Sequence, residues 1–188
     1  PDGGASWTRV LDGRAVLTLL RDSAKGSEER EAEIQRTVGQ SATADVWPAP
    51  LLDIWFAPDG LTGFAVGGFG LILKTSDAGN TWQPWLWKTD NDQRYHLYAL
   101  AGGDGGVFVA GEQGLVMHLD ATTQRFKRVQ TPYNGSFFGI SQFGARLLAY
   151  GLRGNAFVSE DAGRAWKKIE TGLDANLVSA IAHGDSAF

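Results

Sequence analysis

The side chains in this sequence that could do chemistry at a fixed spacing are aspartates in a recurring local pattern. Asp77 and Asp161 occupy the same position in TSDAGNTW (75–82) and SEDAGRAW (159–166). A carboxylate in such a turn can accept hydrogen bonds from backbone N–H groups, bind calcium or transfer a proton. Calcium loops need oxygen ligands at alternate positions, which neither DAGN nor DAGR provides. The pattern therefore favours structural turns over metal or catalytic sites.

Two weaker copies extend the same pattern. Residues 2–7 (DGGASW) match its second half, and residues 118–126 (HLDATTQRF) keep the aspartate and an aromatic residue but lose the glycine. In such an Asp box the carboxylate orders the turn, the glycine adopts a backbone conformation that other residues tolerate poorly, and the tryptophan packs between sheets. The residues expected to build these turns are Asp2, Gly4, Trp7, Asp77, Gly79, Trp82, Asp120, Asp161, Gly163 and Trp166.

Other catalytic constellations are incomplete in the sequence. A sialidase-type hydrolase needs an arginine cluster, a tyrosine nucleophile helped by a glutamate, and an acid–base aspartate. No Arg-Ile-Pro motif of that class occurs. Cysteine is absent, and the three histidines (His96, His118 and His183) lie in no recognised metal-ligand spacing. We therefore expect no catalytic residue, no metal site and no cofactor.

Aromatic residues near turns are the candidates for recognition. In WQPWLW (82–87), Trp85 and Trp87 are two residues apart, so a strand would place both on one face. They could cover an interface between sheets or anchor a ligand. Tyr133 opens an aromatic-rich loop, YNGSFFG, and Arg153 lies in a later turn. Trp85, Trp87, Tyr133 and Arg153 form the candidate interaction surface.

The elements that must position these residues repeat along the chain. The aspartates at 77, 120 and 161 are 43 and 41 residues apart, which matches one four-stranded β-propeller blade. A G-x-x-G turn precedes each aspartate, and two apolar segments precede each turn. Short strands at regular spacing with glycine turns are typical of an all-β array. The pattern predicts four-stranded propeller blades with a repeat of about 42 residues.

The repeat sets the expected domain boundaries. These are a blade end at 1–11, a helical insertion at 12–45, blades at 46–90, 91–132 and 133–174, and the start of a further blade at 175–188. Closed propellers contain about four to eight blades. We therefore expect a partial propeller, completed within a longer protein or by a partner.

The expected insertion does not fit the blade pattern. Ser27 can cap a helix over 28–38, with acidic residues in its first turn and Gly39 as its C-terminal stop. Residues 14–21 (RAVLTLLR) fit either a helix or a strand. We expect a helical hairpin that stands out from one edge of the array. Its weak apolar stripe would rest on the neighbouring blade or on a partner protein; the stripe consists of Ala32, Ile34 and Val38.

The segments GFAVGGFGLILKTSDAGNTW and GLRGNAFVSEDAGRAW resemble the Asp-box repeats of sialidase-like propellers. They are more similar to the photosystem II assembly and stability factor family and its bacterial relatives. The resemblance covers residues 47–188 and the first ten. It implies a non-enzymatic propeller that serves as a scaffold or assembly factor, contacts a protein of a membrane-associated complex, and works outside the cytoplasm.

Composition argues against two classes of partner. The formal net charge is −4 and no basic run is longer than two residues, so the chain lacks the basic stripe of a general nucleic-acid binder. No apolar run approaches the roughly 18 residues of a membrane span.

The alternative to a scaffold is a glycan-binding or glycoside-hydrolase propeller, with Trp85 and Trp87 as sugar platforms. Binding or hydrolysis of a glycan would separate the two hypotheses.

Overall fold

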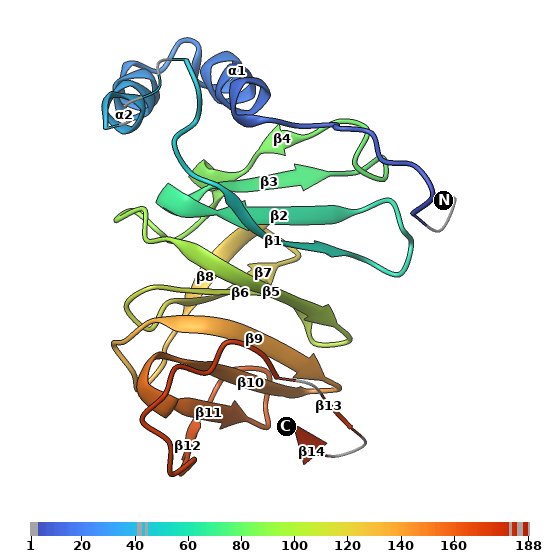
Figure 1. The fold of residues 1–188 in the computed structure, drawn as a ribbon, viewed down its shortest axis with the longest axis vertical. Helices are drawn as coiled ribbons and strands as arrows, with labels where there is room; N and C mark the ends of the chain where they lie inside the picture. Colours follow the sequence, from blue (N-terminus) through green and yellow to red (C-terminus); the bar gives the residue numbers. More distant parts are fainter. Residues whose placement is uncertain (1–3, 41–42, 44, 181, 184–185, 188) are drawn as a thin grey trace.

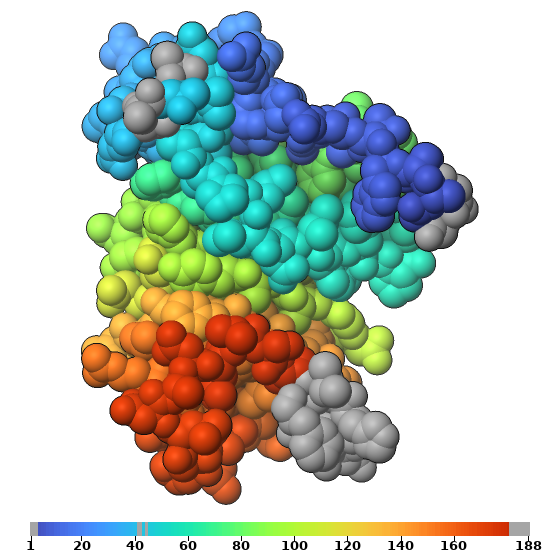
Figure 2. Space-filling model, viewed as in Figure 1, coloured from blue at the N-terminus to red at the C-terminus, as the bar shows by residue number. Residues whose placement is uncertain are grey.

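The computed structural model describes every residue except 1–3, 41–42, 44, 181, 184–185 and 188. The described residues form three four-stranded antiparallel sheets, in each of which the strands follow chain order, together with a short two-stranded sheet and two helices. The three large sheets are stacked face to face, and the helices lie at the end of the stack formed by the first sheet (Figure 1). The space-filling view shows the same order along the molecule (Figure 2). The predicted all-β propeller fold is confirmed.

The three blades share one strand pattern. Blade 1 contains β1 (Leu51–Phe56), β2 (Gly63–Gly67), β3 (Ile72–Thr75) and β4 (Gln83–Pro84). Blade 2 contains β5 (Leu97–Gly103), β6 (Gly106–Gly111), β7 (Val116–Asp120) and β8 (Arg125–Val129). Blade 3 contains β9 (Phe137–Phe143), β10 (Arg146–Gly151), β11 (Ala156–Ser159) and β12 (Lys167–Ile169). The short pair β13 (Ala182–His183) and β14 (Ser186–Ala187) follows. The first strands β1, β5 and β9 lie next to one another and form the inner edge of the stack (Figure 1).

Aromatic side chains fill the space between successive blades. Between blades 1 and 2, the ring centroids of Phe64 and Phe126 are 5.3 Å apart, and Trp85 lies 5.5 Å from Phe64. Between blades 2 and 3, Phe108 and Phe137 belong to one buried cluster. Fully burying a side chain of this size contributes about 1.5–3 kcal/mol. Aromatic packing therefore contributes to the contact between successive blades, together with the aliphatic residues of the same buried clusters.

The Asp box of blade 1 is a closed, hydrogen-bonded turn between β3 and β4. The Asp77 carboxylate accepts hydrogen bonds from the N–H of Thr81 at 2.8 Å, from its hydroxyl at 2.6 Å, and from the Thr75 hydroxyl at 2.8 Å. Gly79 has a φ of 84°, in the left-handed region. The indole N–H of Trp82 donates to the Gly79 carbonyl at 3.0 Å. The characteristic residues of the motif thus act on the turn itself.

The other copies of the motif vary with their sequences. In blade 3, Asp161 accepts a hydrogen bond from the Ala165 N–H at 2.9 Å, Gly163 has a φ of 89°, and the indole of Trp166 donates to the Gly163 carbonyl at 3.1 Å. In blade 2, Asp120 accepts from two successive backbone N–H groups, both at 2.9 Å, and from the Lys127 ammonium at 2.6 Å. This carboxylate caps a plain hairpin turn.

The blade end expected at 1–11 is not tested by the described strands and stays a prediction. Residues 4–12 form no strand, and Asp2 lies outside the described residues. A fourth blade strand is held by pairing with the third strand of its own blade, and none of the described strands pairs with this segment. Trp7 therefore has no sheet to pack on and is 91% exposed, whereas Trp82 contacts Phe56 with a centroid distance of 6.2 Å.

The G-x-x-G turns join the second and third strands of each blade and bring backbone segments into close contact. A Cβ on the first glycine would lie 2.1 to 2.3 Å from a carbonyl oxygen just before the inner strand; the pairs are Gly67 with Pro50, Gly111 with His96, and Gly151 with Ser136. The last glycine of the turn is equally confined in blades 2 and 3. An added Cβ would lie 1.8 Å from the Tyr133 carbonyl oxygen at Gly114 and 2.0 Å from the Leu173 carbonyl oxygen at Gly154. Only glycine fits at these positions.

The first helix of the insertion, α1 (Gly13–Ala24), begins at a side-chain cap. The Asp12 carboxylate accepts hydrogen bonds from the N–H of Arg14 at 3.0 Å and of Ala15 at 2.9 Å. Residues 14–21, for which both a helix and a strand were open, are therefore helical. Apolar residues at helical spacing form one buried face; they are Val16, Leu17, Leu20 and Ala24.

The second helix, α2 (Glu28–Gly39), differs in its ends from the sequence prediction. Ser27 occupies the N-cap position, but its side chain makes no capping hydrogen bond. Gly39 is the last helical residue, and Gln40 continues with right-handed backbone (φ −81°), so Gly39 is not a left-handed stop. Ile34 is buried in the core cluster of blade 1, while Ala32 is exposed. The hairpin thus rests on the neighbouring blade. None of the described helices is long and apolar enough to span a membrane.

The glycine requirement can be tested by a matched pair of substitutions in the full-length protein. Gly144 has a φ of 61° and no atom within 4 Å of an added Cβ, so Gly144→Ala should cost only about 1 kcal/mol of left-handed strain. Gly114 has a φ of 67°, but its added Cβ would lie 1.8 Å from the Tyr133 carbonyl oxygen. We expect Gly114→Ala to cost a further 1–3 kcal/mol, roughly. Denaturant unfolding measures both, and equal losses would contradict this account.

The Asp boxes predict a loss of stability in acid. Hydrogen bonds from Thr81 lower the pKa of Asp77, and the hydrogen bond from the Ala165 N–H lowers that of Asp161. Because both values are depressed on folding, their contribution is complete above the unfolded value of about 3.9 and is lost as the pH falls through the folded value. Asp77→Asn should flatten the melting-temperature profile below about pH 4. Asp174→Asn, outside any Asp box, should leave that profile unchanged.

Candidate functional site

Each blade has two ends with different chemistry. The hairpin between its first two strands and the Asp-box turn lie at one end, as the hydrogen bond from the Ala78 N–H to the Leu61 carbonyl (2.9 Å) shows. The G-x-x-G turns and the connections between blades, 85–96 and 130–136, lie at the other. We call this second end the G-x-x-G face. The hydrogen bonds of Asp77 and Asp161 are made within the turns of the first end, and the tips of the G-x-x-G turns lie at the second.

The third residue of each G-x-x-G turn forms the tip of the face. Phe69, Gln113 and Arg153 have φ values of 55°, 53° and 54°. Left-handed backbone is uncommon for residues with a side chain, and it recurs here at one repeat position. Gln113 and Arg153 are exposed, whereas Phe69 is partly buried. The turn thus presents a variable side chain on a conserved backbone geometry: an aromatic ring, an amide and a guanidinium on successive blades.

The inner strands contribute a second row of side chains to the same face. Each inner strand skips one residue in its pairing with the second strand, which leaves a bulge at Leu52, Tyr98 and Phe138. A bulge redirects its side chain away from the regular alternation of a strand. Tyr98 and Phe138 are partly exposed, and Leu52 is exposed. These three residues occupy equivalent positions at the inner edge of the blades.

Phe69, Tyr98 and Phe138, together with His96, form a continuous aromatic row across the three blades. Ring centroids are 5.1 Å apart for Phe69 and His96, 6.4 Å for His96 and Tyr98, and 5.6 Å for Tyr98 and Phe138. All four side chains are partly exposed. The row is anchored by Glu112. Its carboxylate accepts hydrogen bonds from the backbone N–H of His96 at 2.7 Å and from the Tyr98 hydroxyl at 3.3 Å. Glu112 therefore ties the backbone of His96 and the side chain of Tyr98 to the G-x-x-G turn of blade 2.

The Tyr98–Glu112 pair is the nearest approach to the chemistry of a sialidase. A tyrosine nucleophile must gain phenolate character during attack. Burial and the adjacent Glu112 carboxylate raise the pKa of Tyr98 above its ordinary value. The raised pKa opposes formation of the phenolate, and the phenol donates a hydrogen bond to Glu112 at 3.3 Å. The pair fits an anchoring role for the aromatic row.

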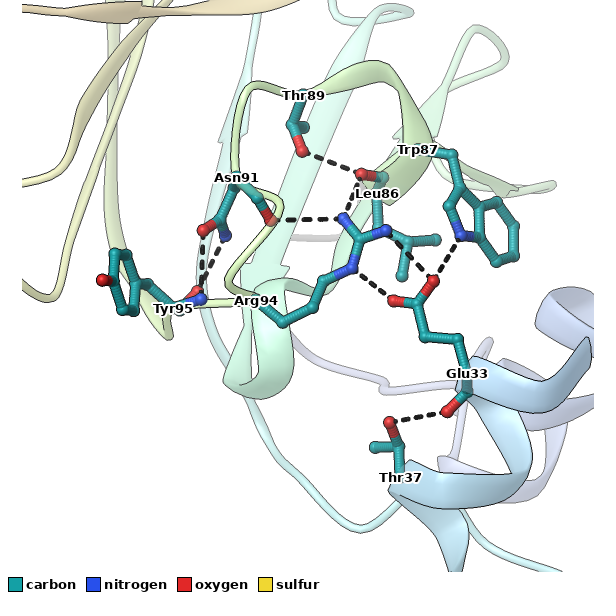
Figure 3. A network of polar contacts seen from close by, with 8 residues as sticks. All are labelled: Glu33, Thr37, Leu86, Trp87, Thr89, Asn91, Arg94 and Tyr95. Carbon is teal, nitrogen blue, oxygen red and sulfur yellow. Dashed lines mark hydrogen bonds and ion pairs between the residues drawn. The ribbon is translucent and has the colours of Figure 1, made fainter. Parts of the chain in front are cut away.

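A polar network fixes α2 to the connection between blades 1 and 2 (Figure 3). The Arg94 guanidinium binds both carboxylate oxygens of Glu33, through Nε to Oε1 and through Nη2 to Oε2 at 3.2 Å. The indole N–H of Trp87 donates to the same Oε2 at 3.0 Å. Arg94 Nη1 also donates to the Leu86 carbonyl at 2.8 Å. A forked guanidinium–carboxylate pair fixes orientation as well as distance.

Electrostatics favour the ionised form of Glu33 in this network. Partial burial opposes ionisation, but the hydrogen bonds from Arg94 and Trp87 outweigh it, so the pKa of Glu33 lies below its ordinary value. The Arg30 guanidinium lies 5.0 Å from the centre of the Trp87 ring, within cation–π range. Both the N–H and the ring of Trp87 are thus engaged by α2.

A groove of about 460 Å³ separates α2 from the same connection. Its lining combines helix residues with the tip of the first G-x-x-G turn and the connection itself. The lining residues are Glu29, Glu33, Arg36, Thr37, Gln40, Phe69, Asp92, Gln93 and Arg94. Phe69 belongs both to this groove and to the aromatic row.

The structure separates the four residues of the candidate interaction surface. The predicted shared strand face of Trp85 and Trp87 is wrong, because the chain leaves β4 and forms a 3₁₀ turn at η2 (Leu86–Lys88). Trp85 is 4% exposed and packs between blades. Tyr133 donates a hydrogen bond to the Leu152 carbonyl at 3.2 Å and packs on neighbouring rings. Arg153 alone is an exposed side chain on the G-x-x-G face.

Sequence reasoning missed the aromatic row and the Glu33–Arg94 pair. Tyr98 and Phe138 each follow the buried first residue of an inner strand, so aligning the repeats would have paired them. Glu33 and Arg94 are 61 residues apart, and no local pattern links them. Within the described part of the chain, no three His, Asp or Glu side chains are grouped so that they could share a metal ion.

The Glu33–Arg94 pair should stabilise the attachment of the helical hairpin to the blades, and this can be tested by substitution. Glu33→Gln should weaken the attachment of α2 by about 1–2 kcal/mol, between the values for exposed and buried ion pairs. Hydrogen exchange of the amides in α2 measures this directly, and protection of β6 should not change. Gln35→Ala on the same helix is the control, since Gln35 is exposed and lies beyond the charged first turn of α2. Equal exchange in both variants would show that the pair does not hold the hairpin.

Comparison with known proteins gives a consistent family assignment. A family model described as Photosynthesis system II assembly factor YCF48 matches residues 40–169. The photosystem II stability/assembly factor HCF136 of Oryza sativa subsp. japonica is 26% identical over 147 residues, covering 72% of this chain and 34% of the relative. The photosystem II assembly lipoprotein Ycf48 of Trichormus variabilis is 41% identical over 58 residues, covering 30% and 17%. The chain thus spans about a third or less of the length of these relatives.

Solved structures share the blade architecture. A structure of YCF48 bound to D1 peptide has a TM-score of 0.57 at 23% identity, with 64% of this chain and 39% of that chain covered. YCF48 from Cyanidioschyzon merolae has a TM-score of 0.53 at 23% identity, with 63% and 39% covered. At this identity the likeness shows the fold alone. The family match covers well over half of the sequence, and on that ground the chain belongs to the Photosynthesis system II assembly factor YCF48 family.

Proposed function

We propose that the chain is part of a non-enzymatic propeller that holds a polypeptide segment of a membrane-associated complex during assembly. Membership of the assembly factor family over residues 40–169 supports this role. A structure of YCF48, which has the same fold, contains a bound D1 peptide. Binding of an extended segment of a client subunit is the activity that we transfer to this chain.

The observation that carries the proposal is the aromatic row on the G-x-x-G face. Four partly exposed rings lie on backbone that is fixed by bulges, by close glycine contacts and by Glu112. Aromatic side chains on rigid backbone bind with little loss of conformational entropy, which favours their use as recognition sites. We place the client segment on this face.

We also propose that the protein works outside the cytoplasm. Cyanobacterial relatives are named as lipoproteins, which supports attachment at a membrane surface for the whole protein. The helical hairpin at residues 13–39 lies outside the range that the family model matches. The proposal therefore extends to a client in a membrane-associated complex and does not name photosystem II as that complex.

The geometry does not favour the glycan hypothesis. A sugar platform needs an exposed ring face. Trp85 is buried between blades, and Trp87 already donates its N–H to Glu33 and lies under the Arg30 guanidinium. The two tryptophans proposed as sugar platforms are thus engaged within the fold.

Site-specific cross-linking tests the proposed function. A photo-reactive amino acid placed at Gln113, on the G-x-x-G face, should capture one subunit of a membrane-associated complex from intact cells. The same group at Leu61, which is exposed at the opposite end of the blades, should not capture it. Phe138→Ser should reduce capture at Gln113, because it removes a ring of the aromatic row. Capture from Leu61 alone, or no protein captured from either position, would refute the proposal.

A further inference from the structure

The groove beside α2 and the aromatic row form one continuous surface. Phe69 lines the groove, and its ring lies 5.1 Å from His96, the next member of the row. The groove exists because the Glu33–Arg94 pair holds α2 over the connection 91–94 (Figure 3). The insertion therefore lengthens the surface that the blades provide.

The charges of the groove favour a basic ligand group. Glu33 and Arg94 neutralise each other in their forked ion pair. The other charged lining residues are two carboxylates, Glu29 and Asp92, and one guanidinium, Arg36. None of these three belongs to an ion pair among the described residues, and all are exposed. The aromatic ring of Phe69 adds a surface that attracts cations.

The spacing of the row can accommodate an extended chain. Successive ring centroids are 5.1, 6.4 and 5.6 Å apart. Side chains on one face of an extended strand recur every ~6.6 Å. Apolar side chains at alternate positions of an extended chain can therefore contact successive rings. A helix also brings side chains on one face to about 5–6 Å, so the extended form follows from the proposed function and not from the ring spacing.

We propose that this surface binds an extended polypeptide segment in which a basic side chain enters the groove and apolar side chains at alternate positions lie along the aromatic row. This inference rests on the proposed function and specifies the chemistry of the client segment. The carboxylates of Glu29 and Asp92 receive the basic group, and Phe69 lies between the two parts of the site. The helical hairpin thus acts as a specificity element that the blades alone do not supply.

The test is selection from a random peptide display library on the immobilised full-length protein. We expect enrichment of peptides with a lysine or arginine beside apolar residues at alternate positions. For a selected peptide, the double variant Glu29→Gln/Asp92→Asn should raise Kd by about 3- to 10-fold and should abolish the preference for a basic residue on reselection. Phe138→Ser should weaken binding about tenfold, and Leu61→Ala, at the opposite end of the blades, should leave it unchanged.

The outcomes separate this inference from the proposed function. Enrichment of apolar peptides without a basic residue, or identical selection by the wild type and the double variant, would overturn the basic subsite even if cross-linking identifies a client. Selection as expected, with no client subunit captured in cells, would support the peptide chemistry and refute the assembly role. Thermal unfolding of each variant confirms that a change in Kd does not arise from unfolding.

Discussion

The structure depends on how closely backbone segments approach one another at the G-x-x-G turns. At the first glycine of each turn, a carbonyl oxygen just before the inner strand occupies the space of a Cβ. The inner strand then bulges within the next two residues, at Leu52, Tyr98 and Phe138. The close contact that requires glycine therefore lies beside the β-bulge of the inner strand. This bulge exposes a side chain at the inner edge of the blade. Blade packing and the proposed client surface therefore share one local geometry in every blade.

The residues of the Asp-box end are engaged within their own turns, whereas the proposed client surface lies at the G-x-x-G end. At the Asp-box end the polar groups of the motif are used within the turn: Asp77 accepts three hydrogen bonds and Trp82 donates its own. At the G-x-x-G end the glycines bear the steric constraint, so the residues between them are free to vary. A repeat of this kind keeps its most regular residues for folding and its variable residues for contact with other molecules.

The helical hairpin is attached by an interaction that fixes orientation. The apolar face of α2 packs on α1 and on blade 1. This packing does not fix the orientation of α2, since burial of apolar surface is non-directional. The forked Glu33–Arg94 pair and the Trp87 hydrogen bond add that direction. A part-buried ion pair loses solvation energy that offsets much of its attraction, so its main effect is the placement of α2 beside the blade connection. The groove follows from that placement.

The sequence by itself determined the blade repeat, the propeller fold, the two complete Asp boxes and the presence of a helical insertion, because these depend on turn residues and apolar spacing within a few residues of one another. Only the tertiary structure decided which aromatic residues face solvent. Trp85 and Trp87 look equivalent in the sequence, but a 3₁₀ turn sends one into the core and the other to α2. The aromatic row and the Glu33–Arg94 pair join residues from different blades and from the insertion, and their contacts arise from the packing of whole elements, which no local pattern encodes.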